Sequence, residues 1–180
     1  AVTLRELLHD PGDYLRQVEQ RAAEQFGGKA TLSLTDQLVD GKLVVQQGII
    51  AGCAGGMYDN IAEAAAILSG GDVGCGPFSL SVYPPSIPVN LELMQNGVQQ
   101  ALLEAGVLFK PCFCGPCFGA GDVPANNALS VRHTTRNFPN REGSKPGDGQ
   151  LSGVLLMDAR SIAATARNHG VVTSAAEVDY

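Results

Sequence analysis

Cysteine is the residue type in this sequence best suited to do chemistry. The chain has 180 residues and five cysteines, and three of the five lie within six consecutive positions. An odd number of cysteines in a chain of this size does not favour a disulfide framework, which is typical of small secreted domains. Crowded thiols in a reducing compartment are typical of metal or redox chemistry instead. The cysteines are Cys53, Cys75, Cys112, Cys114 and Cys117.

The segment Cys114-Gly115-Pro116-Cys117 allows a redox and a metal interpretation. The same four residue types form the thioredoxin active-site motif, where a helix N-terminus lowers the pKa of a thiol. Here Phe113 precedes the motif, the chain contains no tryptophan, and two glycines follow within five residues, which disfavours a helix at this point. The sequence therefore favours the metal interpretation.

Two kinds of metal centre fit a pair of cysteines separated by two residues. A closed zinc site needs four ligands, and Cys53, Cys112 or His133 would complete the set. An iron–sulfur cluster is also held by thiolates, and a cluster with three protein cysteines leaves one iron open to substrate. Cys112 and Cys114 are separated by one residue, which makes it awkward for both to bind one zinc ion. On spacing alone, both kinds of centre remain open.

The apolar pattern predicts strands that bring these distant cysteines together. Residues 43–51 are nearly all apolar, as in a strand covered on both faces, and Cys53 follows that run by two residues. In a parallel sheet, the segments that leave the carboxyl ends of the strands share one edge, where ligands bind. We therefore expect Cys53, Cys114, Cys117 and Arg136 to converge at that edge. Further strands are predicted at 78–82, 107–109, 129–131 and 154–157.

Helical patterns alternate with the predicted strands. Each ends close to a glycine or asparagine, and Asp10, Asn60 and Asp158 are candidate N-caps. This alternation predicts the α/β class, as a three-layer α/β/α sandwich with a mostly parallel sheet, and one domain over residues 1–180. The predicted helices span 11–26, 61–68, 91–105 and 159–168.

The composition excludes several classes of protein. A hydrophobic fraction of 44% with 17% charged residues excludes a disordered chain. The net charge of −6 and the lack of a basic run argue against nucleic-acid binding. The sequence contains no run of 18 apolar residues and therefore predicts no membrane span. Its first twenty residues do not resemble a signal peptide. We therefore expect a cytoplasmic protein that binds neither membrane nor nucleic acid.

Four ordered segments carry a more specific signal. The run Ile50-Ala51-Gly52-Cys53 is followed by Tyr58-Asp59, and the CGPC motif is followed by Gly119. Downstream stand the run RNFPNR at 136–141 and a small-residue run at 157–166. In residue type, order and spacing, these segments resemble the aconitase family of iron–sulfur hydro-lyases over roughly residues 43–175.

The resemblance implies a cofactor and its ligands. It implies a 4Fe-4S cluster held by Cys53, Cys114 and Cys117. One open iron would act on the hydroxyl group of a small hydroxy acid, as in a hydratase or dehydratase. The cluster would be lost easily from purified protein, because neighbouring domains would not shield it.

The resemblance also implies residues that meet the substrate. Arg136 and Arg141 would bind its carboxylates through charge-assisted hydrogen bonds, and Asn137 and Thr135 would lie beside the cluster. The chain departs from the aconitase pattern at Ala54-Gly55, where aconitases carry threonine and asparagine, and at Thr135, where they carry asparagine. These departures remove amide groups from the expected site and argue against citrate or isocitrate as the substrate.

The resemblance covers one domain of a longer family architecture. Aconitases place other catalytic groups, including a serine base, in domains that have no counterpart here. We therefore expect a fragment of a multidomain protein, which holds the cluster site but does not turn over substrate without the remaining domains of the same polypeptide. The alternative from another class is a non-catalytic zinc-binding or iron-sensing regulatory module.

The other polar and sulfur-bearing residues are interpreted as structural. Arg132 and Arg160 are expected to be solvated charges. Cys75 and Cys112 are expected to pack in the interior or beside the cluster, and His133 is expected to be a hydrogen-bonded loop residue.

Overall fold

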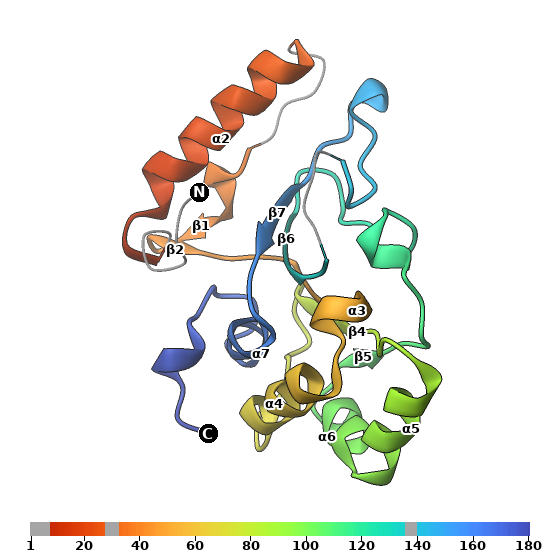
Figure 1. Ribbon diagram of the computed structural model, residues 1–180. Helices are drawn as coiled ribbons and strands as arrows, with labels where there is room; N and C mark the ends of the chain where they lie inside the picture. The colour runs from red at the N-terminus through yellow and green to blue at the C-terminus, as the bar shows by residue number, and fades with distance from the viewer. Residues whose placement is uncertain (1–7, 28–32, 136–139) are drawn as a thin grey trace.

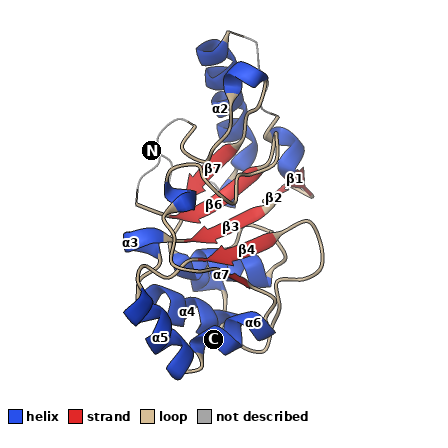
Figure 2. Cartoon of the chain, turned by 90° about the vertical axis from the view of Figure 1, so that its right-hand side faces the viewer, coloured by secondary structure: helices blue, strands red, loops and turns tan. Residues whose placement is uncertain are grey.

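A five-stranded parallel sheet forms the centre of the chain (Figure 2). The computed structural model describes residues 8–27, 33–135 and 140–180. In Figure 2 the labelled strands of this sheet point to the side of the molecule on which the short helix α3 lies. The strands are β3 (Gln47–Ile50), β4 (Ser79–Val82), β5 (Leu108–Phe109), β6 (Leu129–His133) and β7 (Gly153–Leu156).

Strand β3 lies at the middle of this sheet, in the order β5-β4-β3-β6-β7. The chain moves outward from β3 to β4 and β5, then crosses back to β6 on the other side of β3. Strands β3 and β6 are paired, so the segments that follow them leave the sheet at the same carboxyl edge and diverge from there. Open α/β sheets bind their ligands at such a reversal of strand order.

Helices cover one face of the sheet (Figure 1). Helix α7 packs on β3 and β6 and also on α4, which in turn contacts α6 and α5. Gly48 of β3 permits this approach, because a Cβ atom there would lie 3.0 Å from Leu80 and 3.1 Å from Ile162 of α7. The main apolar core fills this interface. The helices are α4 (Tyr58–Leu68), α5 (Ile87–Gln95), α6 (Val98–Glu104) and α7 (Ala159–Arg167).

The opposite face of the sheet carries polar side chains. Ile49 pairs in register with Ser81 and Arg132, so all three side chains point to this side. The segment 112–122 lies over them, because Arg132 donates hydrogen bonds to the carbonyl groups of Pro116 and Asp122. The predicted α/β class and parallel sheet are confirmed, and within the described residues the cysteine-bearing segment covers this second face.

The remaining elements lie before the central sheet, in the connections between its strands, and after α7. Helix α2 (Pro11–Phe26) follows Asp10, as predicted, and ends at Gly27, whose φ of 59° lies in the left-handed region. A two-stranded antiparallel ribbon then precedes the central sheet. The other short elements are η1 (Thr35–Gln37), β1 (Leu38–Val39), β2 (Lys42–Leu43), α3 (Gly52–Gly55), η2 (Gly115–Cys117), η3 (Pro146–Asp148) and η4 (Ala175–Glu177).

Several predicted boundaries are wrong in informative ways. The predicted helix over 91–105 is two helices, because Gly97 adopts a φ of 75° between α5 and α6. The predicted strand over 43–51 is divided between β2 and β3. Asn60 does not cap α4, which begins at Tyr58; its side-chain amide donates instead to the Ala54 carbonyl, at 2.9 Å.

None of the helices in the described ranges has the length and apolar character that crossing a membrane requires.

Asp158 caps helix α7 as predicted, and its carboxylate accepts a hydrogen bond from the Ser161 backbone amide at 3.1 Å. Burial by itself raises the pKa of Asp158, but the hydrogen bonds from Ser161 and the nearby Arg160 outweigh it and lower the pKa. The ionised carboxylate is therefore bound more favourably in the folded chain. Its contribution to stability is present above pH ~4, the usual range of an aspartate, and is lost as the pH falls through the lowered pKa.

We expect Asp158→Ala to lower the free energy of unfolding by about 1 kcal/mol at pH 7, because the α7 N-terminus loses its side-chain acceptor. Asp158→Asn retains the acceptor and should stay close to the parent chain at pH 7, while losing part of the stability difference between pH 7 and pH 3. Urea denaturation monitored by circular dichroism measures both effects. Equal unfolding midpoints for the alanine and asparagine variants at pH 7 would contradict the capping role.

Candidate metal centre

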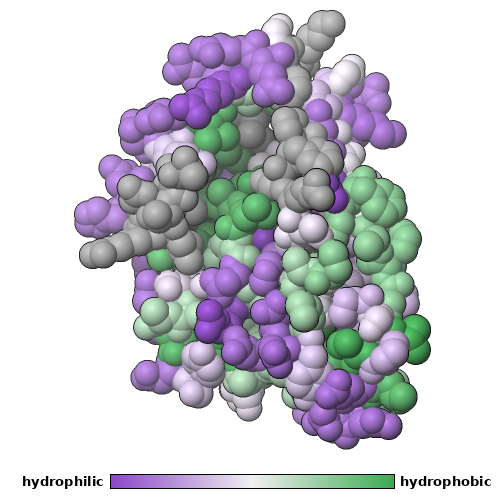
Figure 3. Space-filling view, viewed as in Figure 1, coloured by the Kyte–Doolittle hydropathy of each residue, from purple (hydrophilic) through white to green (hydrophobic). Residues whose placement is uncertain are grey.

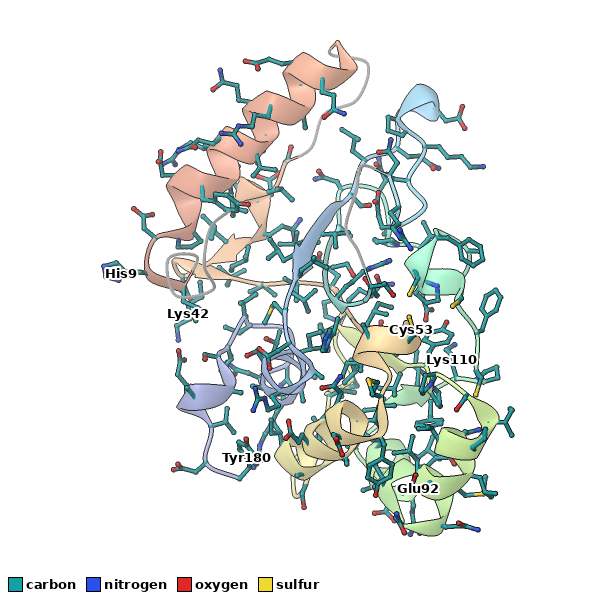
Figure 4. The ribbon with its side chains drawn as sticks, viewed as in Figure 1. His9, Lys42, Cys53, Glu92, Lys110 and Tyr180 are labelled. Carbon is teal, nitrogen blue, oxygen red and sulfur yellow. The ribbon has the colours of Figure 1, made fainter. Side chains whose placement is uncertain are left out.

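The candidate site lies where strands β3, β5 and β6 end, and Figure 4 labels Cys53 there. Helix α3 begins two residues after β3 and carries Cys53 in its first turn. The Cys53 Sγ atom lies 3.5 Å from Thr135 Oγ1, in the segment that follows β6. A Cβ atom on Gly52 would lie 2.7 Å from Cys117 Sγ, in the segment that follows β5. The segments that carry Cys53 and Cys117 therefore lie against each other, whereas the predicted convergence of Cys53, Cys114, Cys117 and Arg136 as a set stays a prediction, with Arg136 outside the described residues.

The CGPC motif forms a tight turn. Only Gly115–Cys117 is helical, as a 3₁₀ turn, and the Cys117 amide donates to the Cys114 carbonyl at 3.0 Å. A Cβ atom on Gly115 would lie 2.0 Å from the Ala120 carbonyl oxygen, so glycine allows the segment to fold back on itself. A three-residue turn supplies no α-helix N-terminus to activate a thiol, and this geometry does not favour thioredoxin-type exchange.

The three candidate thiols differ in exposure. Cys53 and Cys114 are exposed, whereas Cys117 is 5% exposed, and all are free cysteines. In the parts of the chain that the structure describes, no three Cys, His, Asp or Glu side chains lie close enough to ligate one metal ion. This arrangement does not favour a mononuclear zinc site. Thiolates are soft donors that also hold iron–sulfur clusters, in which the ligands bind different iron atoms and can lie farther apart than around a single metal ion.

Glycines let α3 lie against the strand ends. A Cβ atom on Gly55 would be 1.8 Å from the His133 carbonyl oxygen, and one on Gly56 would be 2.2 Å from the Tyr83 carbonyl oxygen. No side chain fits at either position without moving the backbone. The departure from the aconitase pattern at Gly55 therefore has a packing reason in this chain, and it keeps Cys53 close to the sheet.

Arg141 lies beside the cysteine turn. Its Nε atom donates a hydrogen bond to the Cys117 carbonyl, and the side chain is half-buried. Thr135, which was predicted to lie beside the cluster, has its hydroxyl next to the Cys53 sulfur. Arg136 and Asn137, which were predicted to bind substrate and to lie by the cluster, fall outside the described residues. The assignments of ligands and substrate-binding residues stay predictions.

Arg132 is the residue of this region whose placement the sequence interpretation missed. The prediction of a solvated charge is wrong, because Arg132 is 2% exposed and lies under the cysteine segment. Burial lowers the pKa of its guanidinium, while Glu142 and Asp122 act in the opposite direction. A charged residue between Val131 and His133 in a parallel strand was the available signal, since such strands are usually apolar on both faces. Arg160 is partly exposed and pairs with Glu63 and Asp158.

Tyr83 and Asp122 extend the polar layer around Arg132. The Tyr83 hydroxyl donates to the Asp122 carboxylate at 2.7 Å, and burial together with this carboxylate raises the pKa of Tyr83. Gln47 donates to the Asp122 carbonyl at 2.9 Å. These bonds fix the end of the segment that carries the CGPC motif.

The remaining candidate residues lie around the site or away from it. Cys112 is half-buried in the same segment as Cys114, whereas Cys75 is exposed and precedes β4, at the opposite edge of the sheet. The expectation that Cys75 is packed or lies by the cluster is therefore wrong. The Nδ1 atom of His133 is buried without a hydrogen-bond partner, and burial lowers its pKa.

Comparisons with known proteins agree with the geometry. The family model for the aconitase family (aconitate hydratase) matches residues 1–164. The 3-isopropylmalate dehydratase large subunit of Nitratidesulfovibrio vulgaris (strain DP4) is 32% identical over 125 residues, covering 67% of this chain and 29% of the relative. The 3-isopropylmalate dehydratase large subunit 1 of Methanopyrus kandleri is 33% identical over 121 residues, with the same shares. The large subunit 2 of Pyrococcus furiosus is 34% identical over 113 residues, covering 60% and 28%.

The match over residues 1–164 shows that the chain belongs to the aconitase family. The chain spans less than a third of the length of the curated relatives that it matches.

The close approach of α3 to the strand ends can be tested at Gly55. We expect Gly55→Ala to lower the free energy of unfolding by about 1–3 kcal/mol, because the added methyl group overlaps the His133 carbonyl. Gly76→Ala is the matched control, since Gly76 is exposed and has no atom within 4 Å of the added carbon. Denaturant unfolding measures both variants. Equal midpoints for the two would show that α3 is not held tightly.

Proposed function

We propose that this chain is the cluster-bearing part of a hydro-lyase that adds or removes water at a small hydroxy acid. The observation that carries the proposal is the meeting of Cys53, Cys117 and Thr135 from three segments at one edge of the sheet. Cys114 follows β5 in the same turn as Cys117. Membership of the aconitase family supports a 4Fe-4S cluster as the group that these three thiolates hold.

When bound, such a cluster supplies one open iron that polarises the hydroxyl group to be eliminated. The protein residues hold and surround it. Cys53 and Cys114 present exposed sulfur atoms, and Cys117 presents one from within the packed turn. The Thr135 hydroxyl is placed to donate a hydrogen bond to the sulfur of Cys53, which stabilises the thiolate form of this ligand.

The substrate proposal follows from the arginines and from the relatives. Arg141 lies next to Cys117, and Arg136 precedes it in the same run, so we propose that both bind substrate carboxylates. The relatives are named for 3-isopropylmalate, a hydroxy acid with two carboxylates. We propose a substrate of this class, and the absence of an amide side chain at Gly55 and Thr135 supports a substrate other than citrate or isocitrate.

The rest of the enzyme would cover this edge. Phe113 and Phe118 are 51% and 57% exposed beside the cysteines, and their ring centroids are 6.1 Å apart. Figure 3 shows apolar surface on the side where Figure 1 places η2 and α5. We propose that further domains of the same polypeptide, or a second subunit, pack here and supply the catalytic base. Without them the 180-residue chain would bind the cluster but not turn over substrate.

The compartment follows from the thiols. Five free cysteines, three of them proposed as ligands, require reducing conditions, so we propose the cytoplasm.

Anaerobic reconstitution with iron and sulfide tests the cluster. We expect the chain to take up iron and acid-labile sulfide with a broad visible absorption band. Cys53→Ser, Cys114→Ser and Cys117→Ser should each lose most of this absorption, because a hydroxyl is a poor ligand for iron in such clusters. Iron and sulfide assays together with the visible spectrum measure the result.

Cys75→Ser is the matched control, because Cys75 is exposed at the opposite edge of the sheet and should leave uptake unchanged. Stoichiometric zinc without labile sulfide in the purified chain would contradict the proposal and support the regulatory metal module instead.

A further inference from the structure

Arg132 is the most highly connected buried charge in the described residues. Its guanidinium donates to Ser130 Oγ at 2.9 Å and Gln47 Oε1 at 2.9 Å, both on the face of the sheet. It also donates to the carbonyl oxygens of Pro116 and Asp122, each at 3.0 Å. One side chain therefore joins the sheet to the residue before Cys117 and to Asp122, at the end of the cysteine-bearing segment 112–122.

The hydrogen bond from Arg132 to Pro116 lies directly next to Cys117, a proposed cluster ligand. The Pro116 carbonyl belongs to the peptide group whose nitrogen is that of Cys117, and it accepts from Arg132. The carbonyl of Cys117 itself accepts from Arg141. Both peptide groups that flank the buried thiol are thus held by arginines, while Gly52 lies against its sulfur atom.

The buried charge has no hydrogen-bonded carboxylate partner among these contacts. Its four acceptors are neutral groups, and Glu142 and Asp122 act on it electrostatically at longer range. Burying a cation is costly, and a hydrophobic residue at such a position is often as stable or more so. The carboxylates of Glu142 and Asp122 favour the charged form of Arg132, and so does the Cys117 thiol that lies in the segment above it.

We propose that Arg132 is a positioning residue of the cysteine centre. Its hydrogen bonds hold the Cys117 turn on the sheet, and its charge stabilises the reduced, more negative form of a bound cluster. Nearby charge is one of the levers that set the reduction potential of an iron–sulfur cluster. The second part of the inference rests on the proposed function, whereas the first concerns the chain without a cluster.

The positioning role is tested on the reduced, cluster-free chain by timed alkylation with iodoacetamide, followed by peptide mass spectrometry. In the parent chain, Cys117 should react more slowly than the exposed Cys53 and Cys114. In Arg132→Gln, the rate at Cys117 should rise about tenfold or more, because hydrogen bonds from a charged donor no longer oppose local opening. Arg160→Gln is the matched control for loss of a partly exposed arginine, and Cys75 is the internal control. A folded Arg132→Gln with an unchanged rate at Cys117 overturns the inference.

The electrostatic role is tested by the potential of the reconstituted cluster. Arg132→Gln should shift the potential to a more negative value, and Arg132→Lys should restore it toward that of the parent chain, because lysine keeps the charge but not the planar set of donors. Equal potentials in all three chains overturn this part.

A third variant covers the case in which Arg132→Gln does not fold. Ser130→Ala removes an acceptor of Arg132 but keeps the charge and the bond from Gln47 to Asp122, so alkylation of Cys117 should quicken while the potential stays unchanged. An unchanged alkylation rate in this variant overturns the positioning role. If the parent chain takes up no cluster, the proposed function fails, and the alkylation rates still decide whether Arg132 holds the turn.

Discussion

The close approach of backbone to backbone at the carboxyl edge of the sheet is the constraint on which the site depends. Parallel pairing of β3 with β4 and β6 brings three chain segments to one edge, but pairing alone does not set how near they come. Gly55 and Gly56 let α3 touch the ends of β6 and β4, where any side chain would push the helix away. The position of Cys53 relative to Cys117 is therefore fixed by the absence of side chains as much as by their presence.

The two faces of the sheet are assembled by different forces. On the helical face, apolar side chains are buried against α4 and α7, and this burial is strong but not directional. On the other face, a loop with one 3₁₀ turn takes its shape from hydrogen bonds to Arg132 and from the bond between Tyr83 and Asp122. Hydrogen bonds in a buried network are directional, so they specify a single loop conformation where hydrophobic burial would allow several. A site built from a loop gains its precision from this polar layer.

The same difference explains which features could be predicted from the sequence. The strands, α2 and α7 follow from local periodicity and capping, and Asp158 caps α7 through a contact only three residues away. The meeting of Cys53 and Cys117 follows from a general property of parallel sheets. Arg132 could not be placed in this way, because its partners Gln47, Pro116 and Asp122 lie 85, 16 and 10 residues away along the chain.

Local sequence patterns also gave wrong predictions, for the helix over 91–105 and for the cap at Asn60. The apolar stripe from 91 to 105 is continuous enough for one helix, yet Gly97 adopts a left-handed conformation that ends α5 and begins α6. Asn60 has the spacing of a cap but binds the Ala54 carbonyl, so it ties α4 to the helix that carries Cys53. In the first case a left-handed glycine interrupts the helix, and in the second a residue that could cap a helix joins two helices instead. Arg136 and Asn137, by contrast, lie outside the described residues, and no such comparison applies to them.

The exposure of the thiols bears on how the site would work in a longer protein. Cys53 and Cys114 are exposed, and the rings of Phe113 and Phe118 stand beside them half in solvent. Exposed aromatic rings next to reactive thiols are unfavourable in an isolated chain, both for solubility and for protection from oxygen. The matched relatives have more than twice as much further sequence as the part that aligns with this chain. If further domains cover this edge, as proposed above, they would bury the rings and exclude water, and the charges of Arg132 and Arg141 would act on a bound anion with less screening.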